Sequence, residues 1–191
     1  MSLRETFPSL LTSALLIVLA PMICFSQQNA FDLDGRIANP LQSDAGKVTV
    51  LVFVRRDCPI SGRYAPMIQR MSAEDENAVR FYLAFPDKSD SATDIRKYLQ
   101  DFHYSIPAVR DPGHVLVKEA HAEFTPEAAV FDRKGTLVYR GRIDNLYVTF
   151  GRSRQAPTTH ELEDAIQAAL AGRAPANSNV QGIGCYISDL Q

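Results

Sequence analysis

The sequence lacks an excess of charge of either sign. Its 191 residues include 20 lysines and arginines against 22 aspartates and glutamates, a net charge of −2. It also lacks a basic stripe interleaved with aromatic residues, an internal repeat and a low-complexity tract. These absences argue against a nucleic-acid-binding protein, because such proteins concentrate positive charge on one face. The remaining composition, 46% hydrophobic and 22% charged, is typical of one globular domain.

A continuous apolar run of membrane-spanning length is also missing. Apolar residues gather between positions 10 and 25, but polar residues and Pro21 interrupt them, and a spanning helix needs about 20 predominantly apolar residues. With Arg4 ahead of this stretch, residues 1–26 have the layout of a secretory signal peptide. We therefore expect a secreted or periplasmic chain that is not in the membrane after cleavage. An uncleaved N-terminus that anchors the chain to a membrane is the alternative.

Cysteine is scarce, and no C-x-x-C pair occurs. Cys24 lies inside the predicted signal peptide, which leaves Cys58 and Cys185 in the mature chain. In an oxidising compartment, two cysteines can form a structural bridge, a redox couple or two separate thiols. They are far apart in the sequence, so only the fold can bring them together.

The hydrophobic pattern predicts alternating strands and helices. Apolar, β-branched runs at 47–54 and 79–85 are typical of strands buried on both faces. The remaining predictions are a strand or hairpin at 31–35, helices after Cys58, after Ser91, at 114–124 and at 158–171 with a Thr158–Glu161 capping box, and a hairpin at 128–140. This order predicts an α/β fold, with a central mixed β-sheet flanked by helices on both faces.

Cys58 is the strongest candidate for chemistry. It follows a buried strand and begins a helix, in the order Asp57-Cys58-Pro59. Unpaired backbone N–H groups and the helix dipole stabilise an anion at that position. A thiolate is the nucleophilic form of cysteine, so the placement indicates a reactive sulfur. A small apolar cysteine packed in the core is the alternative.

The run from Asp57 to Ser61, followed far downstream by Thr125-Pro126, resembles the thioredoxin-like superfamily, in particular exported bacterial redoxins and thiol–disulfide oxidoreductases. The closing Gly184-Cys185 looks like the same subgroup. The resemblance implies a thioredoxin-like fold over residues 27–171, with a C-terminal tail, 172–191, that carries Cys185. It also implies a cis-proline at Pro126 that lies against Cys58, and no tightly bound organic cofactor.

The sequence departs from each familiar branch of that superfamily at one necessary residue. Thioredoxins place a second cysteine where this chain has Ser61, and Sco-type copper chaperones place one at Gly62. Peroxiredoxins have a threonine and a proline where this chain has Arg55 and Leu51. A disulfide within the first helix turn is therefore impossible, and peroxide reduction loses its usual support.

Two mechanisms remain for the site of Cys58, Ser61, Thr125, Pro126 and Cys185. In the first, Cys58 attacks a disulfide or is oxidised, and Cys185 resolves the product through a long-range disulfide. In the second, Cys58 works alone, an outside thiol releases its mixed disulfides, and Ser61 donates to the thiolate or merely caps the helix. Both imply protein thiols, disulfides or small thiol oxidants as substrates, with an external thiol as electron donor.

Two other classes of function compete with the oxidoreductase. One is a thioredoxin-like module in which the cysteines hold copper or another soft metal, and the other is a degenerate redoxin with a permanent bridge. His114 and His121 could share a helix face and join such a metal, but we expect solvated or packed histidines and no metal site. Glu127 could move protons near Cys58, although a solvated glutamate at a strand edge is the simpler interpretation.

Overall fold

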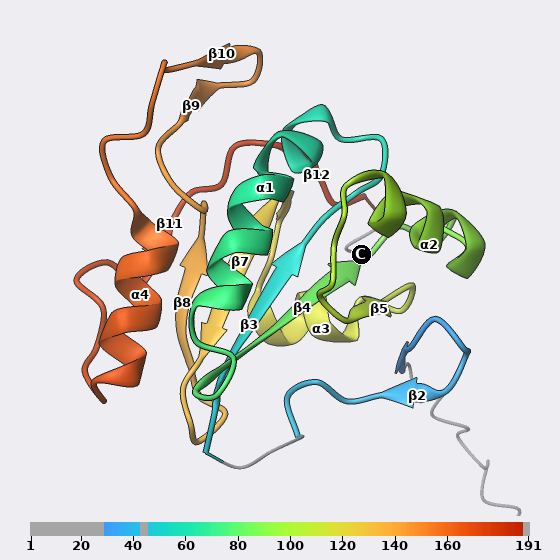
Figure 1. Ribbon diagram of the computed structural model, residues 1–191, viewed down its shortest axis with the longest axis horizontal. Helices are drawn as coiled ribbons and strands as arrows, with labels where there is room; N and C mark the ends of the chain where they lie inside the picture. The colour runs from blue at the N-terminus through green and yellow to red at the C-terminus, as the bar shows by residue number, and fades with distance from the viewer. Residues whose placement is uncertain (1–28, 43–45, 189–191) are drawn as a thin grey trace, which may run out of the picture.

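An eight-stranded sheet forms the centre of the molecule in this computed structural model, which describes residues 29–42 and 46–188 (Figure 1). The strand order is β11-β8-β7-β3-β4-β5-β1-β2. The strands are β1 (Ala30–Phe31), β2 (Ile37–Ala38), β3 (Val48–Phe53), β4 (Val79–Phe85), β5 (Ala108–Arg110), β7 (Glu127–Phe131), β8 (Leu137–Gly141) and β11 (Asn179–Val180). The predicted signal peptide, residues 1–26, lies outside the described residues.

The sheet is mixed. β3, β4 and β5 run parallel, whereas β7 lies antiparallel to β3, and β8 lies antiparallel to β7. The β1–β2 hairpin extends the sheet beyond β5, and β11 extends it beyond β8. The predicted strands at 47–54 and 79–85 and the predicted hairpins are all present, because each carries the apolar or alternating pattern that a sheet position requires.

Helices cover both faces of this sheet, as the sequence predicts. They are α1 (Pro59–Glu74), α2 (Ala92–Asp101), α3 (Val115–Ala120) and α4 (Glu161–Leu170). Side chains of α1, α2 and α4 pack into one core with Val48, Val50 and Val52, whereas α3 packs into a second core with Leu51 and Phe53. The alternation of β3 side chains therefore separates two cores, and α3 lies behind the sheet in Figure 1.

Two predicted helix boundaries are wrong, for identifiable reasons. The helix expected over 114–124 is only α3, because His114 and His121 adopt left-handed backbone conformations with φ of 57° and 53° at its ends. The capping box at Thr158 is absent, because that hydroxyl accepts a hydrogen bond from Asn145 Nδ2 and the helix begins at Glu161.

The residues after 171 take part in the fold. Besides β11, they form β12 (Cys185–Tyr186), which pairs antiparallel with β6 (Phe124–Thr125) in a separate two-stranded sheet. Another small sheet joins β9 (Tyr147–Thr149) and β10 (Arg152–Ser153). In the described part of the chain, no helix combines the length and apolar character needed to cross a membrane.

Candidate functional site

Cys58 lies in the connection between β3 and α1, directly before the helix. It is the N-cap residue of that helix, with φ −86° and ψ 110°, and Pro59 occupies the first helical position, where no N–H donor is needed. The side chain of Cys58 makes no capping hydrogen bond, but its position at the start of the helix, with the backbone of Ser61 nearby, stabilises a negative charge on the sulfur. The residue is only 1% exposed, which leaves little open surface over the nucleophile.

The cis-proline that the resemblance implies lies against this cysteine. The Thr125–Pro126 peptide bond is cis, and Cys58 Sγ donates a hydrogen bond to the Thr125 carbonyl oxygen at 3.0 Å. Thr125 is fully buried. A carbonyl oxygen only accepts, so this hydrogen bond belongs to the protonated state of Cys58.

Strand β12 brings the second predicted cysteine to the same place. Cys185 Sγ lies 3.0 Å from Cys58 Sγ and donates to it, although the two residues are 127 positions apart. Both cysteines are free thiols, Cys58 buried and Cys185 partly exposed. The contact makes a long-range disulfide geometrically accessible, since closing it to about 2.05 Å needs a movement of about 1 Å.

Glycine at position 184 permits this close approach. A Cβ atom added there would lie 2.1 Å from the Thr125 carbonyl oxygen, so any larger residue would push β12 off β6. Two further hydrogen bonds hold the strand: Thr125 Oγ1 donates to the Cys185 carbonyl at 3.3 Å, and Ile187 N donates to Glu123 O at 2.9 Å. The rings of Phe124 and Tyr186, 4.6 Å apart, add an aromatic contact.

The two thiols have opposite acid–base properties. Burial raises the pKa of Cys58, but hydrogen bonds from the Cys185 thiol and from the backbone and hydroxyl of Ser61 outweigh it, so the pKa of Cys58 lies below its ordinary value. Burial, the hydrogen bond to Cys58 and the negative charge on Cys58 raise the pKa of Cys185. Cys58 therefore loses its proton more readily than Cys185 does, and the Cys185 thiol is a donor that stabilises the Cys58 anion.

Ser61, the fifth predicted site residue, is fully buried in the first turn of α1. It is not the helix cap, because Cys58 holds that position. Its hydroxyl oxygen also accepts a hydrogen bond from Arg55 N at 3.4 Å. The structure thus brings Ser61, Thr125, Pro126 and Cys185 together around Cys58.

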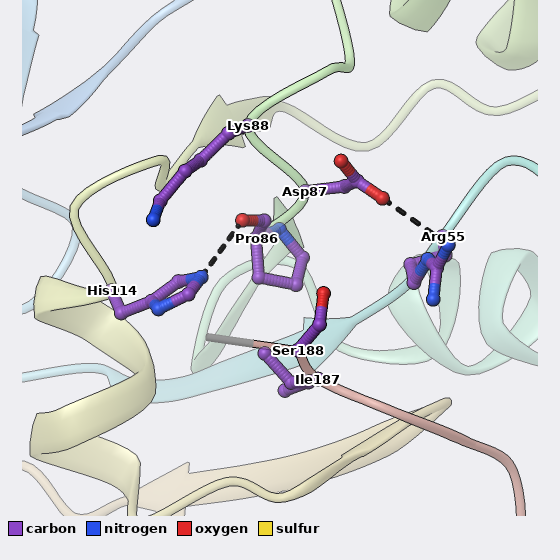
Figure 2. A pocket seen from close by; sticks show the side chains of 7 residues that line it. All are labelled: Arg55, Pro86, Asp87, Lys88, His114, Ile187 and Ser188. Carbon is purple, nitrogen blue, oxygen red and sulfur yellow. Dashed lines mark hydrogen bonds and ion pairs between the residues drawn. The ribbon is translucent and has the colours of Figure 1, made fainter. Parts of the chain in front are cut away.

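A charged rim lies beside the sulfur pair. The Arg55 guanidinium contacts Asp57 at 3.0 Å and Asp87 at 3.2 Å. Figure 2 shows Arg55 and Asp87 at one side of a small pocket, with His114 and Lys88 at the other. Its volume of about 30 Å³ has room for roughly one water molecule.

The histidines have structural positions. Buried His114 places Nε2 3.0 Å from the Pro86 carbonyl, whereas His121 ends α3. The two residues therefore lie at opposite ends of a short helix, His114 buried and His121 exposed. Within 29–42 and 46–188, no group of three histidine, cysteine or acidic side chains is arranged to hold a metal ion.

Glu127 differs from the solvated glutamate that we expected. It is 1% exposed, and its Oε2 accepts hydrogen bonds from the backbone N–H groups of Glu123 at 2.6 Å and Phe124 at 2.9 Å. Burial raises its pKa, although those N–H groups and Arg140 act against this. The carboxyl group thereby fixes the backbone that leads into β6. The signal that we missed is a lone acidic residue at the start of a fully apolar strand.

The chain was compared with protein-family models and with curated proteins, and no match was found in either set. Solved structures do match. An uncharacterized conserved protein from Geobacillus kaustophilus has a TM-score of 0.71 at 23% identity, covering 83% of this chain and 86% of that one. A hypothetical protein from Sinorhizobium meliloti has a TM-score of 0.70 at 18% identity, covering 83% and 88%.

A third matching structure is that of an enzyme. It is a secreted Mycobacterium tuberculosis disulfide oxidoreductase homologous to E. coli DsbE, with a TM-score of 0.51 at 18% identity, covering 75% of this chain and 94% of that one. At these identities a structural match establishes shared architecture and leaves activity to the site itself. The sheet order, the helix that begins at Cys58 and the cis-proline opposite it agree with that architecture, so the chain has the thioredoxin-like fold predicted from its sequence.

Proposed function

We propose that this protein is a thiol–disulfide oxidoreductase whose redox pair is Cys58 and Cys185. The observation that carries the proposal is the 3.0 Å distance between the two sulfur atoms, which connects the start of α1 with β12. Two residues 127 positions apart approach this closely only if the fold places them together. The pair takes the role that the two closely spaced cysteines have in C-x-x-C proteins.

The chemistry follows from the unequal thiols. Cys58 is the better thiolate, because the start of α1, Ser61 and the Cys185 thiol all stabilise negative charge on it. Cys185 stays protonated and donates to it. Exchange with a substrate disulfide or thiol then moves two electrons between the substrate and this pair. When the substrate is a disulfide, an external protein or small-molecule thiol returns the pair to its starting state, and when the substrate is a thiol, an external disulfide does so.

We propose also that residues 1–26 direct export, which would place the pair in an oxidising compartment. The sequence pattern of that segment supports this proposal, and one of the matching structures is that of a secreted protein. Expression of the full chain in a Gram-negative host, with fractionation and N-terminal sequencing, tests it. A periplasmic product that begins at Gln27 is expected, whereas an uncleaved cytoplasmic product would contradict export.

Thiol trapping across a graded glutathione series tests the redox function. The full chain is equilibrated at each potential, quenched with acid and alkylated, and its intact mass and alkylated peptides are measured. A Cys58–Cys185 disulfide that opens reversibly in the range of oxidoreductases, about −120 to −270 mV, is the expected result. A bond that resists reduction below about −300 mV would make the bridge structural, and two permanently free thiols would exclude the pair.

A further inference from the structure

The two sulfur atoms of the pair are unequally accessible to a substrate. Cys58 is 1% exposed and lies beneath the Thr125 carbonyl and β12. Cys185 is partly exposed on β12, next to Tyr186, which is 71% exposed. Closing the sulfur–sulfur distance from 3.0 Å to a bond moves the atoms by about 1 Å and leaves Cys58 beneath the same carbonyl.

We propose that an external thiolate attacks Cys185, and that Cys58 is the sulfur that leaves. This deepens the proposed function, on which it rests, by naming the sulfur that meets the substrate. It reverses the order expected from the sequence, in which Cys58 meets the substrate and Cys185 resolves the product. Cys58 remains the nucleophile within the protein, but its target is a mixed disulfide carried by Cys185.

The ability of each sulfur to leave also favours attack at Cys185. In thiol–disulfide exchange, the sulfur that better carries negative charge leaves faster. Cys58 lies at the start of α1, where the backbone and hydroxyl of Ser61 both help to stabilise that charge. On Cys185, burial and the charge of Cys58 both disfavour a thiolate. Attack at Cys185 therefore combines the more open sulfur with the better leaving group.

Oxidation of the substrate by the protein disulfide needs no further reagent. The substrate thiolate forms a bond to Cys185 Sγ, the bond between the two cysteines breaks, and its electron pair stays on Cys58 Sγ as a thiolate. A second substrate thiolate then attacks the substrate sulfur, forms the substrate disulfide and releases Cys185, which takes a proton from water. The substrate loses two electrons and the protein gains them. A low-molecular-weight disulfide, such as oxidised glutathione, regenerates the protein disulfide.

A mapping experiment on the full chain tests this order. The protein is oxidised with glutathione disulfide, desalted and mixed with reduced glutathione, then quenched with acid at a series of short times. Free thiols are alkylated with N-ethylmaleimide, and the peptides are mapped by mass spectrometry. We expect glutathione on Cys185 and N-ethylmaleimide on Cys58, in at least about tenfold excess over the reverse pattern when extrapolated to zero time.

Equal or greater labelling of Cys58 by glutathione would overturn the proposal. If oxidation produces no internal disulfide, the proposed function itself fails, and this is visible before any thiol is added. A Gly184→Ala variant provides the matched comparison, because its Cβ would displace β12 and uncover Cys58. Its labelling ratio is expected to fall well below that of the wild type. An unchanged ratio would mean that β12 does not control which sulfur is attacked.

Discussion

Replacing Gly184 with alanine tests whether docking of β12 controls the redox pair. The added Cβ would lie 2.1 Å from the Thr125 carbonyl oxygen and 3.1 Å from Pro126 N. Real Cβ atoms essentially never come closer than 3.0 Å, so β12 must move by at least 3.0 − 2.1 = 0.9 Å. Both obstacles are backbone atoms next to the cis peptide bond, and no side-chain rotation can relieve them. The effect is steric, because φ of Gly184 is not in the left-handed range.

The size of the expected change in reduction potential follows from the contacts that hold β12. Moving the strand weakens the Ile187–Glu123 and Thr125–Cys185 hydrogen bonds and the packing of Tyr186 on Phe124. Two net hydrogen bonds of about 1 kcal/mol each amount to about 2 kcal/mol. The equilibrium constant for disulfide formation should fall about 30-fold, which raises the reduction potential by about 40 mV.

The assay is the glutathione titration with thiol trapping, performed on the wild type and two variants. Gly182→Ala is the matched control, because the three atoms nearest its added Cβ all belong to the Phe124 side chain, at 3.3 Å or more. A displacement of a few tenths of an ångström relieves that contact, so a shift of the reduction potential below about 10 mV is expected. If Gly184→Ala shifts the potential no more than Gly182→Ala does, disulfide formation does not depend on docking of β12.

Three further predictions concern groups around the site and the fold. Cys185→Ala removes a donor that lowers the pKa of Cys58, so the pH midpoint of Cys58 alkylation should move upward. Ser61→Ala should move this midpoint in the same direction. A downward shift in either variant would contradict the role of these two residues in lowering the pKa of Cys58. Burial raises the pKa of Glu127, so its contribution to stability is complete below its unfolded pKa of about 4.3 and is lost as pH rises through the higher folded value. The urea midpoint of Glu127→Gln should therefore rise relative to that of the wild type as the pH increases above about 4.3, and a constant difference would refute this. Asp111→Ala leaves the N–H groups of Val115 and Val117 without their carboxylate acceptor and should cost about 2–4 kcal/mol of unfolding free energy, against at most about 0.5 kcal/mol for the exposed control Lys97→Ala.

The sheet was predictable because its strands carry a strong local signal. All six residues of β3 are buried, and the apolar runs of β3 and β4 correspond closely to the observed strands. Helix ends were less predictable, since a non-local partner can override a capping residue. Thr158 illustrates this, because Asn145, thirteen positions earlier, occupies the hydroxyl that would otherwise cap α4.

The functional site likewise has a part that the sequence predicts and a part that it does not. The position of Cys58 at the start of a helix could be read from the residues on either side of it. Its approach to Cys185 could not, because β6 and β12 have two residues each and pair across 60 positions. Strands of that length carry no periodicity, and their partner is set by the backbone fit at Gly184. Glu127 was misassigned for a related reason, since its N–H donors, Glu123 and Phe124, lie directly before and at the start of β6, a strand too short to predict from sequence.

If Cys58 and Cys185 are the redox pair that we propose, placing the second cysteine on β12 links the redox state to the stability of the whole domain. A disulfide between them would close a loop spanning 127 positions. In the chain-entropy model, such a loop removes about 5 kcal/mol of conformational freedom from the unfolded chain. Oxidation should therefore raise the unfolding free energy by that amount, less the free energy needed to bring the sulfur atoms from 3.0 Å to bonding distance. A cysteine at position 61 would close a loop of only a few residues, for which the same model gives about 2 kcal/mol. The distant pair thus couples electron transfer to folding more strongly than an adjacent pair can.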